Sequence, residues 1–260
     1  MKGSANMVFY FTGTGNSLYA ARQLEAEPVS IPQVMRGRER EFTAESIGIV
    51  SPVYGHEVPP MVKDFLREST FETGYFYIIL TYGCRHGGAA ELAKELCVEC
   101  GVRVDYINTL HMADSWLPAF DMDAERAMDK HIPEQLAAIT ADVKARRHAI
   151  SPVTDNDRAA HQEYLRNVSG VPEAMWQNLV VVTERCVGCG VCTRVCPADC
   201  MVLENGRAKH IPGNCQDCLA CAHACPHKAI ALAMPEKNPN ARYRNEHVTL
   251  QDLIAANGKA

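Results

Sequence analysis

The sequence predicts two folded parts: an α/β domain built on a doubly wound parallel sheet of five strands, and a smaller α+β domain rich in cysteine. Three observations carry this prediction. Apolar runs alternate with segments of helical periodicity over residues 1–110, a glycine-rich loop follows the first apolar run, and nine of the 12 cysteines lie between Cys186 and Cys225. Strands that alternate with helices favour a parallel sheet covered by helices on both faces.

The strands of the α/β domain are predicted from short apolar runs that end in turn residues. The four clearest runs, and a weaker one near Val29–Ile31, are Met7–Phe11, Ile47–Val50, Phe76–Leu80 and Val102–Asn108. Ligands of such sheets bind beyond the carboxyl ends of the strands. We therefore expect the binding loops at residues 12–17, 51–59 and 81–88.

Helical periodicity fills the intervals between these runs. Apolar residues recur with helical spacing in Ser17–Glu25, after Pro60, and from Leu92 to Cys100. A later helix is expected to start at Pro133, and Thr249 with Asp252 predicts a capped helix over Leu250–Ala256.

The composition shifts along the chain predict where its parts begin and end. We expect the α/β domain in residues 1–150, a helical linker in 151–178, the cysteine-rich domain in 179–234 and a tail in 235–260 that carries the short helix. Residues 111–178 contain no clear strand. This stretch is predicted to form a lid, a wedge between domains or a substrate wall.

Composition excludes several classes of function. The formal net charge of −5 lacks the basic excess of a nucleic-acid-binding protein. No apolar run is much longer than Tyr75–Leu80, whereas a membrane-spanning helix needs about 20 such residues. Residues 1–6 lead into no hydrophobic signal core. We therefore expect a cytoplasmic protein without a membrane span.

The cysteine-rich domain contains an internal repeat of 29 residues. Each half has the pattern Cys-x2-Cys-x2-Cys-x3-Cys-Pro. The first half contains Cys186, Cys189, Cys192 and Cys196, and the second contains Cys215, Cys218, Cys221 and Cys225. Zinc sites also use paired cysteines, but they lack this doubled order with a proline after each last cysteine. The pattern is typical of two [4Fe–4S] clusters.

The ligands of the two clusters are expected to cross between the halves. Three closely spaced thiolates can face one cube, whereas the fourth cysteine of each half lies too far along the chain and reaches the other cluster. The spacing predicts one cluster on Cys186, Cys189, Cys192 and Cys225. It predicts the other on Cys215, Cys218, Cys221 and Cys196.

Four cysteines fall outside this scheme. Cys200 is interpreted as a buried residue beside the cluster loop, and Cys97 and Cys100 as part of the apolar face of a helix. A redox or metal role of the Cys97–Cys100 pair is the alternative. Cys84 lies in an expected binding loop, where a reactive role is a second possibility beside a structural one.

The loop after the first strand predicts a phosphate site. It consists of Thr12, Gly13, Thr14, Gly15, Asn16 and Ser17. Backbone N–H groups at a helix start and short hydroxyl side chains suit an anion. The loop has no lysine for a nucleotide P-loop, and Leu18 replaces the third glycine of a dinucleotide fingerprint. A terminal monophosphate is therefore the expected ligand, with a bare turn as the alternative.

These motifs resemble known families. Residues 180–232 are similar to bacterial two-cluster ferredoxins, and the loop at 12–17 resembles the FMN phosphate loop of flavodoxins. The order of the motifs resembles flavodoxin–ferredoxin fusion proteins of anaerobic bacteria and archaea. The resemblance implies a flavodoxin-like sheet, two [4Fe–4S] clusters and FMN.

The resemblance also implies which loops hold the flavin ring. Tyr54 is the leading candidate for stacking on the ring, followed by Tyr82 and Trp116, and His56 is expected to face solvent. The complete set of ring candidates is Pro52, Val53, Tyr54, Gly55, Thr81, Tyr82, Gly83 and Trp116.

These cofactors predict a flavoprotein oxidoreductase. Electrons from a low-potential donor or a redox partner protein would pass through the clusters to FMN and on to an unknown acceptor. Two alternatives stay open: an electron carrier without its own substrate, and a ferredoxin whose flavin-free second domain serves for docking. A homodimer is possible, and no catalytic residue stands out.

Overall fold

The computed structural model describes residues 2–258, which divide into two compact units. The first, here called the sheet unit, comprises the chain up to Phe11 together with Asn16–Met112 and Lys130–Arg166. The second, here called the cysteine unit, comprises Thr12–Gly15, Ala113–Asp129 and the chain from Asn167 onward. The sheet unit therefore extends past residue 150, and part of the helical stretch 151–178 packs within it.

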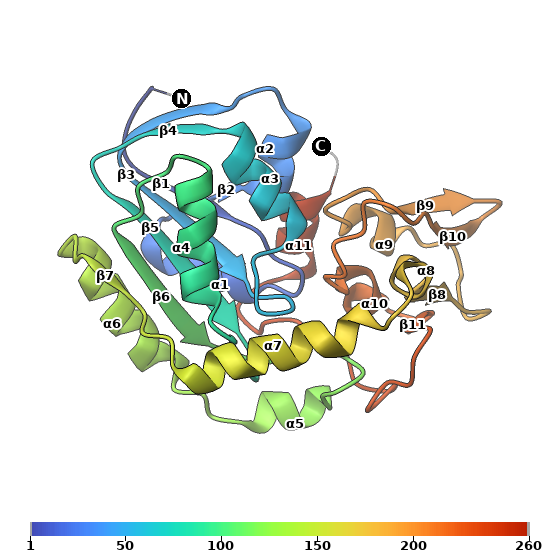
Figure 1. The fold of residues 1–260 in the computed structure, drawn as a ribbon. Coiled ribbons are helices and arrows are strands. Elements are labelled where there is room, and N and C mark those ends of the chain that lie inside the picture. Colours follow the sequence, from blue (N-terminus) through green and yellow to red (C-terminus); the bar gives the residue numbers. More distant parts are fainter. Residues whose placement is uncertain (1, 259–260) are drawn as a thin grey trace. The chain divides into compact units, whose positions relative to one another are not determined.

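The sheet unit contains a parallel sheet in the strand order β2-β1-β3-β5-β6-β7, with β4 paired to β3 (Figure 1). Its five principal strands are β1 (Lys2–Tyr10), β2 (Val29–Ser30), β3 (Glu41–Pro52), β5 (Phe76–Tyr82) and β6 (Tyr106–His111). This order is that of flavodoxin-like sheets, which confirms the predicted fold class. The short strands β4 (Thr70–Glu72) and β7 (Ala149–Ile150) extend the sheet beyond the five that were expected.

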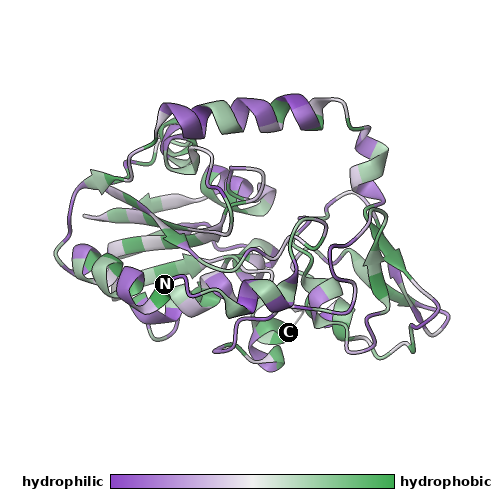
Figure 2. Ribbon diagram, turned by 90° about the horizontal axis from the view of Figure 1, so that it is seen from below, coloured by the Kyte–Doolittle hydropathy of each residue, from purple (hydrophilic) through white to green (hydrophobic). Residues whose placement is uncertain are grey.

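Helices cover both faces of this sheet. Helix α1 (Asn16–Leu24) packs beside α6 (Ile132–Lys144) on one face, and α4 (Ala89–Glu99) lies across the other. The connections between the strands also contain α2 (Ile31–Arg36) and α3 (Pro60–Glu68). Figure 2 shows strands that are largely hydrophobic, whereas α7 (Asp155–Ser169) is largely hydrophilic.

The core beside α3 is aromatic. The ring of Phe9 lies 4.7 Å from that of Phe42 and 4.9 Å from that of Phe65, and Phe71 lies 5.2 Å from Phe76. Such edge-to-face and tilted pairs add about 1 kcal/mol each to the burial of their surface. This cluster fixes the central strands, whose carboxyl ends form the loops of interest.

Strand β6 begins four residues later than the apolar run at Val102 predicted. Helix α4 ends in a left-handed Gly101, with φ +71°, and the N–H of Val102 donates to the carbonyl of Cys97 at 2.8 Å. This pattern is a Schellman cap, in which an apolar residue after the glycine packs back on its own helix. Val102 therefore closes α4 instead of opening a strand.

The cysteine unit contains two antiparallel strand pairs and several short helices. Strand β8 (Val180–Val182) pairs with β11 (Ile230–Leu232), and β9 (Met201–Glu204) pairs with β10 (Arg207–His210). The helices that lie wholly within this unit are α5 (Met122–Ala127), α8 (Glu173–Gln177), α9 (Val191–Arg194), α10 (Ala220–Ala224) and α11 (Leu250–Asn257). The predicted capping box of α11 is present: Thr249 and Asp252 bond reciprocally. In residues 2–258, no helix combines the length and apolarity that crossing a membrane requires.

Candidate iron–sulfur and flavin sites

The first predicted ligand set surrounds one cavity of the cysteine unit. Cys186 and Cys189 approach it from the loop that leads into α9, Cys192 approaches it from α9 itself, and Cys225 approaches it from the end of α10. The remaining wall is apolar and includes Ala208 and Ile230. The structure thus brings the fourth cysteine of the second motif to the three of the first, as the crossed assignment expects.

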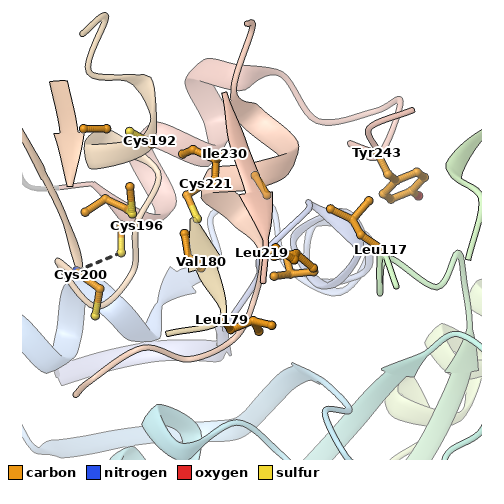
Figure 3. Packing of buried hydrophobic residues seen from close by; sticks show 14 of the residues in the cluster. Leu117, Leu179, Val180, Cys192, Cys196, Cys200, Leu219, Cys221, Ile230 and Tyr243 are labelled. Atoms are coloured by element: carbon orange, nitrogen blue, oxygen red, sulfur yellow. Dashed lines mark hydrogen bonds between the residues drawn. The ribbon is translucent and has the colours of Figure 1, made fainter. Parts of the chain in front are cut away.

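The second ligand set surrounds a separate cavity. Cys215, Cys218 and Cys221 line it together with Cys196, which follows α9. Cys200 lines the same cavity and is 4% exposed. Figure 3 shows Cys196 and Cys221 among the apolar side chains of Val180 and Ile230. A cavity walled by four sulfurs and apolar groups suits a thiolate-bound cubane.

The sulfurs of each set are spread around a space instead of converging on one point. Within residues 2–258, no three His, Cys, Asp or Glu side chains are grouped so that they could hold a single metal ion. Structural zinc requires four ligands at about 2.0–2.3 Å from one centre. The geometry therefore fits two clusters better than two zinc ions.

Backbone amides point at the sulfurs in equivalent places of the repeat. The N–H of Cys200 donates to Sγ of Cys196 at 3.2 Å, and the N–H of Ala229, which is 29 residues later, donates to Sγ of Cys225 at 3.2 Å. The dashed line in Figure 3 marks the first of these bonds. Such bonds stabilise the negative charge on ligand sulfur and help to set the cluster potential.

Burial and hydrogen bonds shift the thiol pKa values in opposite directions. N–H groups of Ala208 and Gly188 hold the pKa of Cys186 below its usual range. Burial raises the pKa of Cys218 and Cys221 well above it. A bound metal centre deprotonates coordinating thiols outright, so the buried pair would become thiolates on cluster binding.

The first four residues of the predicted phosphate loop, Thr12–Gly15, are buried and belong to the cysteine unit, whereas its last two, Asn16 and Ser17, begin α1 in the sheet unit. The N–H of Gly15 donates to Oγ1 of Thr12 at 3.0 Å, and Oγ1 of Thr14 donates to Oγ of Ser115 at 3.4 Å. Gly15 has φ +103°, and a Cβ there would lie 3.0 Å from the Cβ of Val248. The loop leads directly into α1, whose first-turn amides have no intrahelical acceptor. These residues fit a phosphate group.

The loops expected to hold the flavin ring meet at the carboxyl edge of the sheet. The N–H of Val53 donates to the carbonyl of Thr81 at 2.9 Å, and the hydroxyls of Ser17 and Thr81 share a hydrogen bond of 2.8 Å. Tyr54 forms a small bridge with Glu57 and lies edge-on to Phe11, with 6.4 Å between ring centres. The structure therefore brings together Ser17, Val53, Tyr54 and Thr81.

Two aromatic candidates lie in different surroundings. Tyr82 stacks on His111 at 5.2 Å and meets His86 edge-on at 5.1 Å. Trp116 belongs to the cysteine unit, where it packs against the core that contains Leu117. The roles of both residues toward a flavin ring stay predictions.

Helix α7 packs over the loops at the carboxyl edge. Tyr164 contacts the turn at Gly55, where an added Cβ would lie 2.3 Å from the tyrosine hydroxyl. His56, with φ 72°, lies 5.1 Å from the ring of Tyr164 and 5.6 Å from that of His161. His56 was expected to face solvent, but it is half-buried beneath this helix.

Helix α7 and the loop after β5 enclose a polar cavity of ≈ 260 Å³. It is lined by Tyr82, Cys84, Arg85, His86, Asn156, Asp157 and Ala160. Sequence reasoning named only Tyr82 and Cys84 among these residues. The histidine, arginine and aspartate carry no motif, because they meet only when α7 folds back on a loop about 70 residues earlier in the chain.

The two oppositely charged side chains that line this cavity, Arg85 and Asp157, differ in their partners. Arg85 has no carboxylate partner within residues 2–258. Asp157 accepts hydrogen bonds from the hydroxyl and N–H of Thr154, which lower its pKa, and its Oδ1 lies 3.8 Å from Nε2 of His86. Burial, and then His161 and Arg85, lower the pKa of His56.

Comparison with known protein families identifies an iron–sulfur domain in the cysteine-rich part of the chain. Residues 178–238 match the family model described as a 4Fe-4S dicluster domain. No curated protein matches the chain.

Several solved structures are similar to part of the chain. The Trp repressor binding protein of Bacillus subtilis is 11% identical, with 55% of this chain and 99% of that chain covered and a TM-score of 0.35. A flavodoxin from the domain Archaea is 14% identical, with 52% and 98% covered and a TM-score of 0.27. Rubredoxin oxygen:oxidoreductase of Desulfovibrio gigas is 15% identical, with 54% and 36% covered and a TM-score of 0.30.

The fold assignment itself rests on the parallel order β2-β1-β3-β5-β6, and the cofactor assignment on the eight cysteines around two cavities. The chain therefore joins a flavodoxin-like α/β domain to a 4Fe–4S dicluster domain in one redox protein.

Proposed function

We propose that this protein is an iron–sulfur flavoprotein oxidoreductase that reduces a small anionic acceptor with electrons from a low-potential donor. Two [4Fe–4S] clusters, held by the two cysteine sets, would exchange single electrons, and FMN would supply two-electron chemistry. The phosphate loop and the loops after β3 and β5 would bind the FMN.

The observation that favours an enzyme over a simple carrier is the cover formed by α7. A carrier needs an exposed ring edge, whereas an enzyme shields its reacting groups from water. Helix α7 packs on the turn at Gly55 and on His56, and its first residues wall the cavity beside Tyr82. These loops are the ones expected to hold the flavin ring.

The charge of the cavity favours an anion. Arg85 lines it without a carboxylate partner in the described part of the chain, and a guanidinium binds carboxylates through paired N–H groups. The only carboxylate among the lining residues is Asp157, which lies 3.8 Å from His86.

His86 is also positioned to hold a proton. The N–H of Gly88 donates to its Nδ1 at 3.4 Å, which leaves Nε2 as the protonated nitrogen that faces Asp157. A carboxylate placed in this way orients the ring and its N–H group. The Nε2–H group is therefore the candidate proton donor to an acceptor bound in the cavity.

The first experiment measures the cofactors and a small acceptor together. Protein purified without oxygen should contain about eight iron atoms and one acid-released FMN per chain. With dithionite as donor it should reduce 4-nitrobenzoate, each nitro group taking two electrons and two protons to form the nitroso compound and water. If the protein passed electrons only to another redox protein and not to 4-nitrobenzoate, it would be a carrier. If it contained the clusters but bound no FMN, even after incubation with FMN, its α/β domain would have a docking role.

The Arg85→Gln variant tests the cavity. Loss of a charge-assisted hydrogen bond costs about 1.5–3 kcal/mol, which corresponds to a KM for 4-nitrobenzoate about 10- to 100-fold higher. The KM for neutral nitrobenzene should not change. Arg103→Gln is the matched control, because Arg103 is 85% exposed and pairs with Asp105. Equal effects of Arg85→Gln on the two acceptors would contradict an anion site.

A further inference from the structure

The tail of the chain contacts the phosphate loop through three residues of the cysteine unit. The N–H of Asn245 donates to the carbonyl of Thr14 at 2.9 Å, and Nδ2 of Asn257 donates to the carbonyl of Thr12 at 2.9 Å. Val248 packs against Gly15. Both hydrogen bonds engage carbonyl oxygens of the loop. The loop amides, which an anion would need, are not the groups that the tail uses.

An asparagine at position 257 destabilises the fold unless its side chain is hydrogen-bonded. It is fully buried at the end of α11, and its Oδ1 has no hydrogen-bond partner within residues 2–258. A buried polar atom without a partner destabilises the folded state. An apolar residue of similar size would fill the same space without that cost, so the bond to Thr12 is the property that distinguishes asparagine at this position.

The same loop is linked to the cluster helix α10. Thr14 donates to the hydroxyl of Ser115, whose carbonyl lies 2.9 Å from Nε2 of His223. Nδ1 of His223 accepts the N–H of Tyr243 at 3.0 Å, so Nε2 carries the proton and donates it to Ser115. His223 lies between Cys221 of the second ligand set and Cys225 of the first.

The far end of the tail also lies against a cluster helix. At Gly258, directly after α11, an added Cβ would lie 2.5 Å from the carbonyl oxygen of Arg194, the last residue of α9. Helices of four and five residues, such as α9 and α10, are far too short to be stable alone. They depend on packing and on the metal centre that their cysteines hold.

The geometry points to a coupling between the two cofactor sites: the cluster domain, through α11 and the Ser115–His223 link, holds the phosphate loop in the shape that binds FMN. This inference rests on the proposed function. Cluster loss would release α9 and α10, and the loop would then lose the partners of Thr12 and Thr14. Because linkage is reciprocal, bound FMN should equally slow the loss of the clusters.

The test measures the Kd of FMN for the full-length protein by quenching of free flavin fluorescence. Protein with both clusters is compared with protein from which a chelator has removed the iron. We expect the Kd to rise at least tenfold on iron removal. Without FMN present, hydrogen exchange at residues 12–15 should become faster in the iron-free protein.

Point variants separate the contact from general damage. Asn257→Leu keeps the number and branching of the side-chain heavy atoms and removes the bond to Thr12, so it should raise the Kd about tenfold with unchanged iron content. Asn240→Leu is the matched control, because Asn240 is an exposed residue of the same unit. Should Asn257→Leu fail to fold, Ser115→Ala decides, because it removes the partner of Thr14 and retains the carbonyl that His223 uses.

The outcomes distinguish the two proposals. Wild-type protein that binds no FMN in either cluster state overturns the proposed function. Wild-type protein that binds FMN equally well with and without clusters overturns the coupling and leaves the proposed function standing. An unchanged Kd in the variant that folds likewise removes the roles assigned to these contacts.

Discussion

The two halves of the cysteine repeat have similar backbone conformations but differ in their side chains. Left-handed residues recur 29 positions apart: Gly188 and Asp217 have φ 70° and 48°, and Gly190 and Leu219 have φ 75° and 53°. The first half uses glycine at these positions, and the second half uses residues with side chains. The geometry of the ligand loop is therefore fixed by the cysteine spacing, whereas its surroundings are free to diverge.

The surroundings differ most at the second ligand set. Cys200 lies beside the sulfurs of Cys196 and Cys215, whereas the equivalent residue near the first set is Ala229. The Cys200 thiol, followed by His210, lowers the pKa of Cys215 to about 4. Two cavities with the same ligands thus offer different electrostatic environments. Two clusters in such environments should have different potentials.

The largest effect comes from breaking the crossed ligand sets. Replacing both Cys186 and Cys225 by alanine removes two ligands from one cavity, so about four iron atoms per chain should remain. Replacing Cys215 and Cys225 removes one ligand from each cavity and should leave almost none. Iron and sulfide assays on anaerobically purified protein measure the difference.

The opposite order of these results would contradict the crossing. If each motif held its own cluster, the Cys215/Cys225 pair would retain half of the iron and the Cys186/Cys225 pair would lose it all. The single variants Cys97→Ala and Cys84→Ala serve as controls, because neither residue lines a cluster cavity. Both should retain about eight iron atoms.

A smaller effect is expected where the halves differ in glycine. At Gly188 an added Cβ would lie 2.1 Å from the carbonyl oxygen of Gly206, in a left-handed conformation. Gly188→Ala should therefore lower the stability of the cysteine unit by about 2–3 kcal/mol. Asp217→Gly at the equivalent position should change it by less than about 1 kcal/mol, because relief of strain is offset by the freedom of glycine in the unfolded chain.

Loss of cluster absorbance with increasing urea, recorded without oxygen, compares these two variants. If Gly188→Ala and Asp217→Gly shifted the urea midpoint equally, the backbone at residue 188 in the first half of the repeat would be no more crowded than that at residue 217 in the second. The sheet unit offers an internal reference, since neither substitution touches its aromatic core around Phe9.

Local patterns explain which features the sequence alone could predict. The parallel sheet follows from the alternation of strands and helices, and the cysteine sets follow from spacings of two or three residues. The capping box at Thr249 and Asp252 is equally local. The late start of β6, four residues after Val102, arises from a cap motif whose hydrogen bond to Cys97 competes with an apolar run.

Long-range packing explains what the sequence could not predict. Asn257 reaches Thr12 across 245 positions, and Asp157 reaches His86 only when α7 folds back. Neither pair carries a motif, because a single hydrogen bond between distant residues leaves no periodic trace. The two iron–sulfur clusters were therefore predictable from the sequence, whereas the cavity under α7 and the tail contacts were not.

The smallest expected effect would make the two halves alike. Cys200→Ala gives the second set the residue that the first set has at Ala229. The Cys200 thiol lies beside the sulfurs of Cys196 and Cys215, and loss of this polar group should remove about 1 kcal/mol of stabilisation of the reduced cluster, or about 40 mV for one electron. The potential of the second cluster should become more negative by that amount, and that of the first should not change.

Redox titration followed by electron paramagnetic resonance measures both potentials in one sample. In the variant, the N–H of residue 200 still donates to Sγ of Cys196. The backbone hydrogen bond is therefore unchanged, and only the thiol is lost. A shift in both clusters would indicate that Cys200 acts through the packing of the whole unit. A shift confined to the second cluster would show that one side chain, placed on a repeated backbone, separates the potentials of two otherwise equivalent centres.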